Sequence, residues 1–135
     1  MNKLLRRLRN EEQGSATIEF LALALPLFIP LFIFLNQYAL QSDTESSMRT
    51  LGREMARAFV LSENDEVAAR VTEEVFQKGS DVLGFANDAR SGDLSYSYQC
   101  ESSPCISPDN RVEIRLNSKR AGRAFFAVEY VSPWA

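Results

Sequence analysis

Few side chains in this sequence could carry out chemistry. The chain contains no histidine, the commonest general base and metal ligand. Its only cysteines, Cys100 and Cys105, fall in one short stretch, CESSPC. Two cysteines cannot complete a structural zinc site, so they indicate either a short-loop disulfide or a pair of free thiols. An oxidising compartment favours the disulfide, and the membrane segment described below makes the disulfide our prediction.

No other pattern indicates an enzyme. The sequence has no Gly-rich phosphate loop and no spaced cluster of metal ligands. The acidic tract at residues 63–66 and the Asp109–Asn110 pair could recruit Ca²⁺, but they are more typical of a helix start and a turn. We therefore expect no catalytic residue, no metal ion and no cofactor.

Glu19 is the ionisable residue whose position most needs an explanation. It lies at the edge of an apolar segment, and a carboxylate inside a bilayer costs about 2.5–3.5 kcal/mol. One interpretation is a functional carboxylate that needs a positively charged partner in the membrane. The other is that Glu19 lies at the level of the lipid headgroups, beside the basic residues that precede it. Its position alone leaves both interpretations open.

The apolar segment itself predicts a membrane-spanning helix. Residues 20–35 read FLALALPLFIPLFIFL, and their neighbours extend this segment to the ~20 residues that span hydrocarbon. Pro26 and Pro30 would break a helix in water but are better tolerated in lipid, so we expect a softened helix. A cleaved secretory signal is the alternative. Its apolar core is usually only ~7–15 residues long, and no small-x-small cleavage site follows this one.

The charge distribution predicts the orientation of this helix. Of the 15 basic and 18 acidic residues in the chain, residues 1–14 hold four and two, which leaves 11 and 16 for the remainder. A basic leader stays in the cytoplasm, so the rest of the chain is expected beyond the membrane. The net charge of -3 gives no general attraction to nucleic acid. The basic residues of the leader are Lys3, Arg6, Arg7 and Arg9.

Helical spacing continues well past the apolar segment. We expect one helix from Ser15 to Leu61, followed by a second, short helix that Ser62 caps and Gly79 closes. The first of these helices carries a buried stripe beyond the membrane, formed by Met48, Leu51, Met55 and Phe59.

From residue 94 the apolar period changes to two, which predicts three short strands. The expected fold class is α+β. A long N-terminal transmembrane and amphipathic helix would pack on a small antiparallel three-stranded sheet, with a second short helix beside it. The alternating sets are Leu94, Tyr96, Tyr98 and Cys100, then Val112, Ile114 and Leu116, then Phe126, Val128 and Tyr130.

The stretch EEQGSATIEFLALALPLF, which contains Gly14, Ser15, Glu19 and Phe20, resembles the N-terminal motif of the TadE-like pseudopilins. These are minor subunits of the tight-adherence (Flp) pilus system, within the type IV pilin-like superfamily. The resemblance covers residues 3–40. It implies that a membrane-embedded prepilin peptidase cuts after Gly14, so that Ser15 becomes the new N-terminus.

The resemblance also implies a role for Glu19 and Phe20 in assembly. The ammonium group at Ser15 and the Glu19 carboxylate of a neighbouring subunit would neutralise each other in a low dielectric and set the axial register of packed helices. The implied partners are the prepilin peptidase, the minor and major pilins of the same system, the inner-membrane assembly platform and the lipid bilayer.

These expectations divide the chain into three parts. Residues 1–14 form a cytoplasmic leader that is removed, residues 15–40 the transmembrane helix, and residues 41–135 an α+β region in the periplasm or outside the cell. The protein would be a structural subunit or an assembly and initiation factor of an adhesive pilus, held in the bacterial inner membrane before it enters the fibre. The alternative is an uncleaved, signal-anchored membrane protein with a periplasmic binding or sensory domain, which has no use for Gly14 or Glu19.

Overall fold

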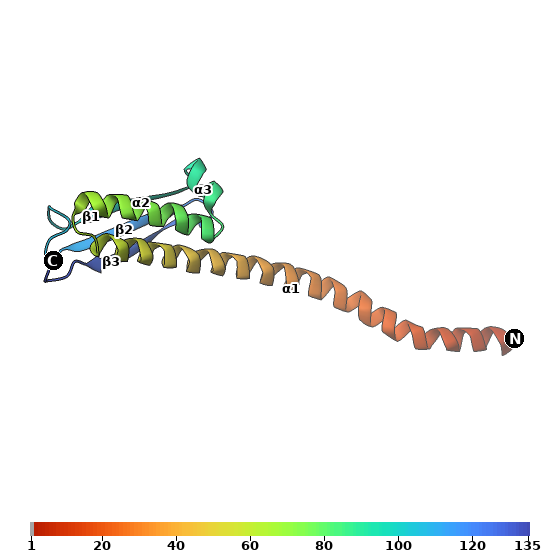
Figure 1. The fold of residues 1–135 in the computed structure, drawn as a ribbon. Coiled ribbons are helices and arrows are strands. Elements are labelled where there is room, and N and C mark those ends of the chain that lie inside the picture. The colour runs from red at the N-terminus through yellow and green to blue at the C-terminus, as the bar shows by residue number, and fades with distance from the viewer. Residues whose placement is uncertain (1) are drawn as a thin grey trace. The chain divides into compact units, whose positions relative to one another are not determined.

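The computed structural model describes residues 16–135 with their side chains (Figure 1). The first helix, α1, runs over Asn2–Val60 and is the longest element. It is followed by α2 (Asp65–Val82), α3 (Ala86–Ser91), β1 (Leu94–Cys100), β2 (Arg111–Ser118) and β3 (Arg123–Tyr130). By its contacts the chain divides into two compact units, Met1–Leu40 and Gln41–Ala135. The fold class is α+β, as the sequence predicted.

The second half of α1 supplies the main helical face of the core in residues 41–135. Its apolar stripe of Met48, Leu51, Met55 and Phe59 is buried, as the helical spacing predicted. Gly52 lies on the same face, and a Cβ atom placed on it would lie 3.4 Å from Leu116 Cδ1 in the sheet. A Cβ atom at that distance makes ordinary van der Waals contact, so α1 lies close to the sheet at this point.

The second helix, α2, begins and ends at residues other than those we expected. Its N-cap is Asn64, whose side-chain oxygen accepts a hydrogen bond of 3.0 Å from the backbone N–H of Val67. Ser62 does not cap it, because its hydroxyl donates instead to the carbonyl of Ala58 in the last turn of α1 (2.9 Å). Gly79 does not close it either, since α2 continues to Val82.

Gly79 has a packing role within α2 in place of the predicted terminal one. A Cβ atom at this position would lie 2.5 Å from Cδ1 of Leu51, a side chain that is 2% exposed. The absence of a side chain at Gly79 allows α2 to lie against α1 at this point.

We expect Gly79→Val to destabilise the unit formed by residues 41–135, because the new side chain would overlap the buried Leu51. Overpacking of this kind costs about 1–3 kcal/mol. The change should appear as a lower denaturant midpoint for the detergent-solubilised chain. Arg70→Val, at an exposed position of the same helix, is the matched control. An unchanged midpoint for Gly79→Val would contradict the close packing of the two helices.

The three strands form one antiparallel sheet in the order β1-β2-β3. Tyr96 pairs with Leu116, and Leu116 pairs in turn with Phe125. The short helix α3 precedes β1, and its C-cap is Gly92 in the left-handed conformation (φ 83°). The inner face of the sheet packs against the helices, and the register of the pairs fixes which residues of each strand belong to that face.

The apolar set that the sequence analysis gave for β3 is not the buried one. Phe125 and Ala127 are buried, whereas Phe126, Val128 and Tyr130 are exposed on the opposite face. The close approach of α1 explains the difference, because a Cβ atom at Gly52 would lie only 3.5 Å from the Ala127 methyl. The small side chain of Ala127 suits this close approach, and Phe126, Val128 and Tyr130 lie on the other face.

Candidate functional site: the membrane anchor and the disulfide loop

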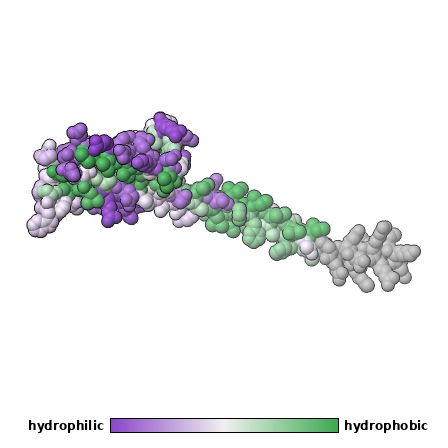
Figure 2. Space-filling model, in the orientation of Figure 1, coloured by the Kyte–Doolittle hydropathy of each residue, from purple (hydrophilic) through white to green (hydrophobic). Residues whose placement is uncertain are grey.

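The apolar part of α1 has the length and composition of a membrane span. Within residues 16–135, one helix, Ala16–Val60, contains a window apolar enough to cross a bilayer, and none of that window is buried inside the structure. Large hydrophobic side chains from Ile18 to Leu40 are exposed around it. Figure 2 shows the nearly unbroken apolar surface that results. These properties are compatible with a single-pass membrane protein.

Glu19 and Phe20 lie at the beginning of this apolar surface. Phe20 is 69% exposed, and Glu19 is exposed beside it. Among the described residues, no hydrogen bond or ion pair engages Glu19. Any group that pairs with its carboxylate would therefore lie outside residues 16–135. The structure does not describe the side chains of the predicted cleavage residues Gly14 and Ser15, nor those of the leader residues Lys3, Arg6, Arg7 and Arg9.

Cys100 and Cys105 are joined by the disulfide that the sequence predicted, with their Cα atoms 5.4 Å apart. Cys100 is the last residue of β1, so the bridge fixes the start of the loop that leads to β2. Buried Asn110 holds the interior of this loop. Its side-chain amide donates to the carbonyls of Ser102 (2.8 Å) and Cys105 (2.8 Å), and its oxygen accepts from the backbone N–H of Ser102 (3.1 Å).

Asp65 ties the disulfide loop to the first turn of α2. Its carboxylate accepts hydrogen bonds from the backbone N–H groups of Cys105 (2.9 Å) and Ile106 (2.7 Å). Hydrogen bonds to a charged acceptor are stronger than neutral ones, so one side chain holds two distant segments together. The sequence predicted an acidic residue at this helix start but gave no signal of its long-range partners.

A second polar contact joins α2 to the sheet. The Tyr96 hydroxyl donates a hydrogen bond of 2.6 Å to the Glu73 carboxylate, and the Tyr96 ring lies 4.8 Å from that of Phe76. This hydrogen bond, with a second from Gln77, lowers the pKa of Glu73. Burial, followed by the same contact with Glu73, raises the pKa of Tyr96 well above its usual range. The ring of Tyr96 and the charge of Glu73 thus fix how α2 lies on β1.

The residues weighed as Ca²⁺ ligands take part in these same contacts. Asn64 caps α2, Asp65 binds the loop backbone, and Asn110 holds the loop together. Asp109 occupies the turn with a left-handed backbone (φ 58°). Within the part of the chain that the structure describes, no group of three or more His, Cys, Asp or Glu side chains could hold a metal ion.

Comparison with known proteins gives no relative for this chain. No family model, no curated protein and no solved structure matches it.

The disulfide leads to a prediction about the compartment of the domain. If residues 41–135 lie in the periplasm, a thiol-alkylating reagent added to intact cells without reductant should modify neither Cys100 nor Cys105. Prior reduction should expose both thiols. Because the loop is short, we expect Cys100→Ser with Cys105→Ser to cost about 2 kcal/mol at most. Alkylation of both cysteines without reduction would mean free thiols or a cytoplasmic domain.

Proposed function

We propose that this chain is a minor, TadE-like pseudopilin, a structural subunit or initiation factor of a tight-adherence pilus. The observation that carries the proposal is Glu19 at the entrance to an exposed apolar helix, five residues after Gly14 in the motif GSATIEF. A carboxylate without a partner at that position is costly in lipid. The proposal gives it one, the α-amino group that cleavage creates at Ser15 of a neighbouring subunit.

The two parts of the chain have separate tasks in this proposal. The apolar helix holds the precursor in the inner membrane, with the basic leader in the cytoplasm. A prepilin peptidase removes residues 1–14, and the same helix then packs against the helices of the other pilins as the assembly platform extracts it from lipid. Residues 41–135 remain outside the cytoplasm, where the Cys100–Cys105 disulfide persists.

The exposed domain is suited to this structural role by its own core. Its buried residues come from α1, α2 and all three strands, so the end of α1 is fixed to the domain along several turns. When neighbouring subunits hold or pull this end of α1, the shared core transmits that force to the sheet. Single-residue cavities along this face would loosen that connection by a few kcal/mol each.

Deletion of the coding sequence from its native strain tests the function. We expect surface pili, counted by electron microscopy, to be lost or severely reduced and to return on complementation with the wild-type chain. The chain should also copurify with the major pilin from detergent-solubilised membranes. Normal piliation in the deletion strain, together with retention of residues 1–14, would instead favour an uncleaved membrane-anchored protein.

A further inference from the structure

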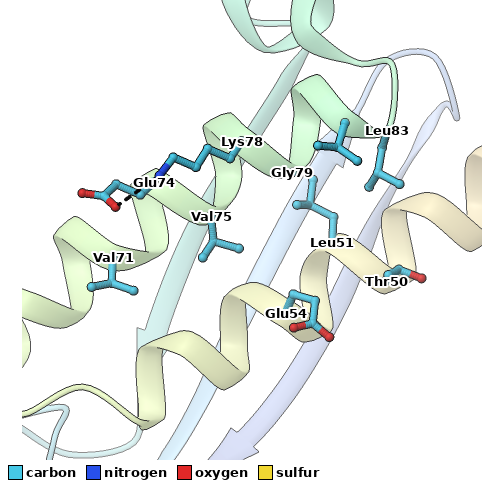
Figure 3. A pocket seen from close by; sticks show the side chains of 10 residues that line it. Thr50, Leu51, Glu54, Val71, Glu74, Val75, Lys78, Gly79 and Leu83 are labelled. Atoms are coloured by element: carbon cyan, nitrogen blue, oxygen red, sulfur yellow. Dashed lines mark ion pairs between the residues drawn. The ribbon is translucent and has the colours of Figure 1, made fainter.

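An apolar groove runs between α1 and α2 on the side away from the sheet (Figure 3). Leu51 of α1 forms its floor, and α2 with its C-terminal end contributes the apolar side chains of Val71, Val75, Val82 and Leu83. The rest of the lining is Thr50, Glu54, Glu74, Lys78 and Gly79. Its volume is about 450 Å³. In Figure 2 hydrophobic residues gather between the more polar outer surfaces of the two helices. Val82, 84% exposed, stands at one end of the groove.

A second apolar surface lies on the outer face of the sheet. Phe126, Val128 and Tyr130 are 60%, 38% and 61% exposed and follow one another along β3. We call these three residues the β3 stripe. The strand is at the edge of the sheet, so one of its sides has no neighbouring strand among the described residues. Exposed apolar side chains in a row on an edge strand are a template for association.

The groove and the β3 stripe belong to opposite faces of residues 41–135. Gly52 of α1 packs toward the inner face of the sheet, and the period of two turns Phe126 to the outer face. A molecule with an apolar groove on one face and an apolar stripe on the other can bind its own copies head to tail. Such a contact repeats without closing, unless the rotation between copies closes a ring.

One charged residue beside each surface has the opposite sign to the other, whereas Glu74 and Lys78, which also line the groove, pair with each other (4.0 Å). Arg115 lies next to the stripe, with its guanidinium carbon 5.4 Å from the centre of the Phe126 ring, and its only hydrogen bond among the described residues goes to Asn117 (3.2 Å). Glu54 lies at the rim of the groove and has no ion pair or hydrogen bond within residues 16–135. Within residues 16–135 neither Arg115 beside the β3 stripe nor Glu54 beside the groove has an ion pair, and their opposite charges favour the same docking.

We propose that the β3 stripe of one copy of this chain docks into the α1–α2 groove of a second copy, with Arg115 of the first paired to Glu54 of the second. The contact deepens the proposed function, since a head-to-tail contact suits a fibre subunit, but it uses only residues 41–135. The stripe is smaller than the ~800 Å² per partner of a stable interface, so the contact is weak in solution. Confinement of the anchors to one membrane raises the effective concentration and compensates for this weakness.

Site-directed cross-linking of the full-length chain in native membranes tests the proposal. Two differently tagged copies are coexpressed, one with Val82→Cys in the groove and the other with Val128→Cys in the stripe, and treated with a flexible bis-maleimide. The native cysteines do not react because they form a disulfide. We expect a dimer with both tags. The same-face pairs, Val82→Cys with itself and Val128→Cys with itself, are the matched controls and should give little product.

Charge reversal supplies a second readout. Glu54→Arg or Arg115→Glu alone should lower the yield of the mixed dimer roughly tenfold, the ratio that corresponds to about 1.4 kcal/mol. A chain with both substitutions should recover it. Equal yields from the same-face pairs, no mixed dimer, or an adduct with a different protein alone would overturn the proposal.

The mature N-terminus, measured in the same sample, separates this inference from the proposed function. Processing at Gly14 without the mixed dimer refutes only the groove contact. The mixed dimer in chains that retain residues 1–14 supports the contact and refutes the pseudopilin assignment.

Discussion

Glu19→Ala should leave a chain that inserts and is cleaved normally but no longer supports pilus formation. The substitution removes the carboxylate that would neutralise the Ser15 ammonium group of a neighbouring subunit. Within residues 16–135 the Glu19 side chain has no ion pair or hydrogen bond, so its removal breaks no contact inside the described part of the chain. An ammonium left unpaired in a low dielectric costs about 3–5 kcal/mol, which weakens association by roughly 100-fold or more. Piliation and copurification with the other pilins measure this loss.

Two further variants at the same position sharpen the test. Glu19→Gln keeps the size and polarity of the side chain without its charge, so it should fail as Glu19→Ala does. Glu19→Asp keeps the charge and should retain part of the function. Normal piliation with Glu19→Ala or Glu19→Gln would mean that Glu19 merely lies at the headgroup level.

Gly14→Val should leave the full-length precursor in the membrane. The proposed peptidase has to bring its catalytic groups to the peptide bond after residue 14, and a β-branched side chain there displaces the bond from the productive position. A misplacement of about 1 Å can reduce a rate by roughly 100-fold. Pulse labelling in a strain with its own prepilin peptidase should therefore show precursor and almost no shortened product.

Ser15→Ala is the matched control for the cleavage-site variant. It changes the residue on the other side of the same bond but keeps it small, so processing should proceed at close to the wild-type rate. If Gly14→Val is shortened as fast as wild type, cleavage at this bond is not what the motif encodes.

Elements with a single unambiguous period were predicted correctly from the sequence. The stripe of Met48, Leu51, Met55 and Phe59 has one apolar face at helical spacing, and all four residues are buried. The apolar run of residues 20–35 likewise predicts a helix by its length, and α1 contains it. The nearness of Cys100 and Cys105, together with the membrane segment that suggested an oxidising compartment, predicted their disulfide.

The face of β3 could not be predicted in the same way, because both of its faces are apolar. Phe125 and Phe126 are neighbours, as are Ala127 and Val128, so the period of two fits either register. The choice depends on how closely α1 approaches at Gly52, which is a property of the packed domain. The pattern of residues within one strand does not reveal a contact with a helix that is distant in the sequence.

The roles of Gly79 and Asp65 were missed for a related reason. A glycine near the end of a helical pattern is typical of a C-cap, yet Gly79 is required by the side chain of Leu51 on another helix. Asp65 suits the first turn of a helix, and this local explanation conceals its hydrogen bonds to Cys105 and Ile106. The α1–α2 groove, similarly, exists only once the two helices are packed.

The intact mass of the protein purified from native membranes tests the central claim most directly. The pseudopilin assignment predicts a chain that begins at Ser15, lacks residues 1–14 and carries one disulfide. In a strain without its prepilin peptidase, the same measurement should give the full-length chain. A mass that includes residues 1–14 in a strain with an active peptidase would contradict the assignment.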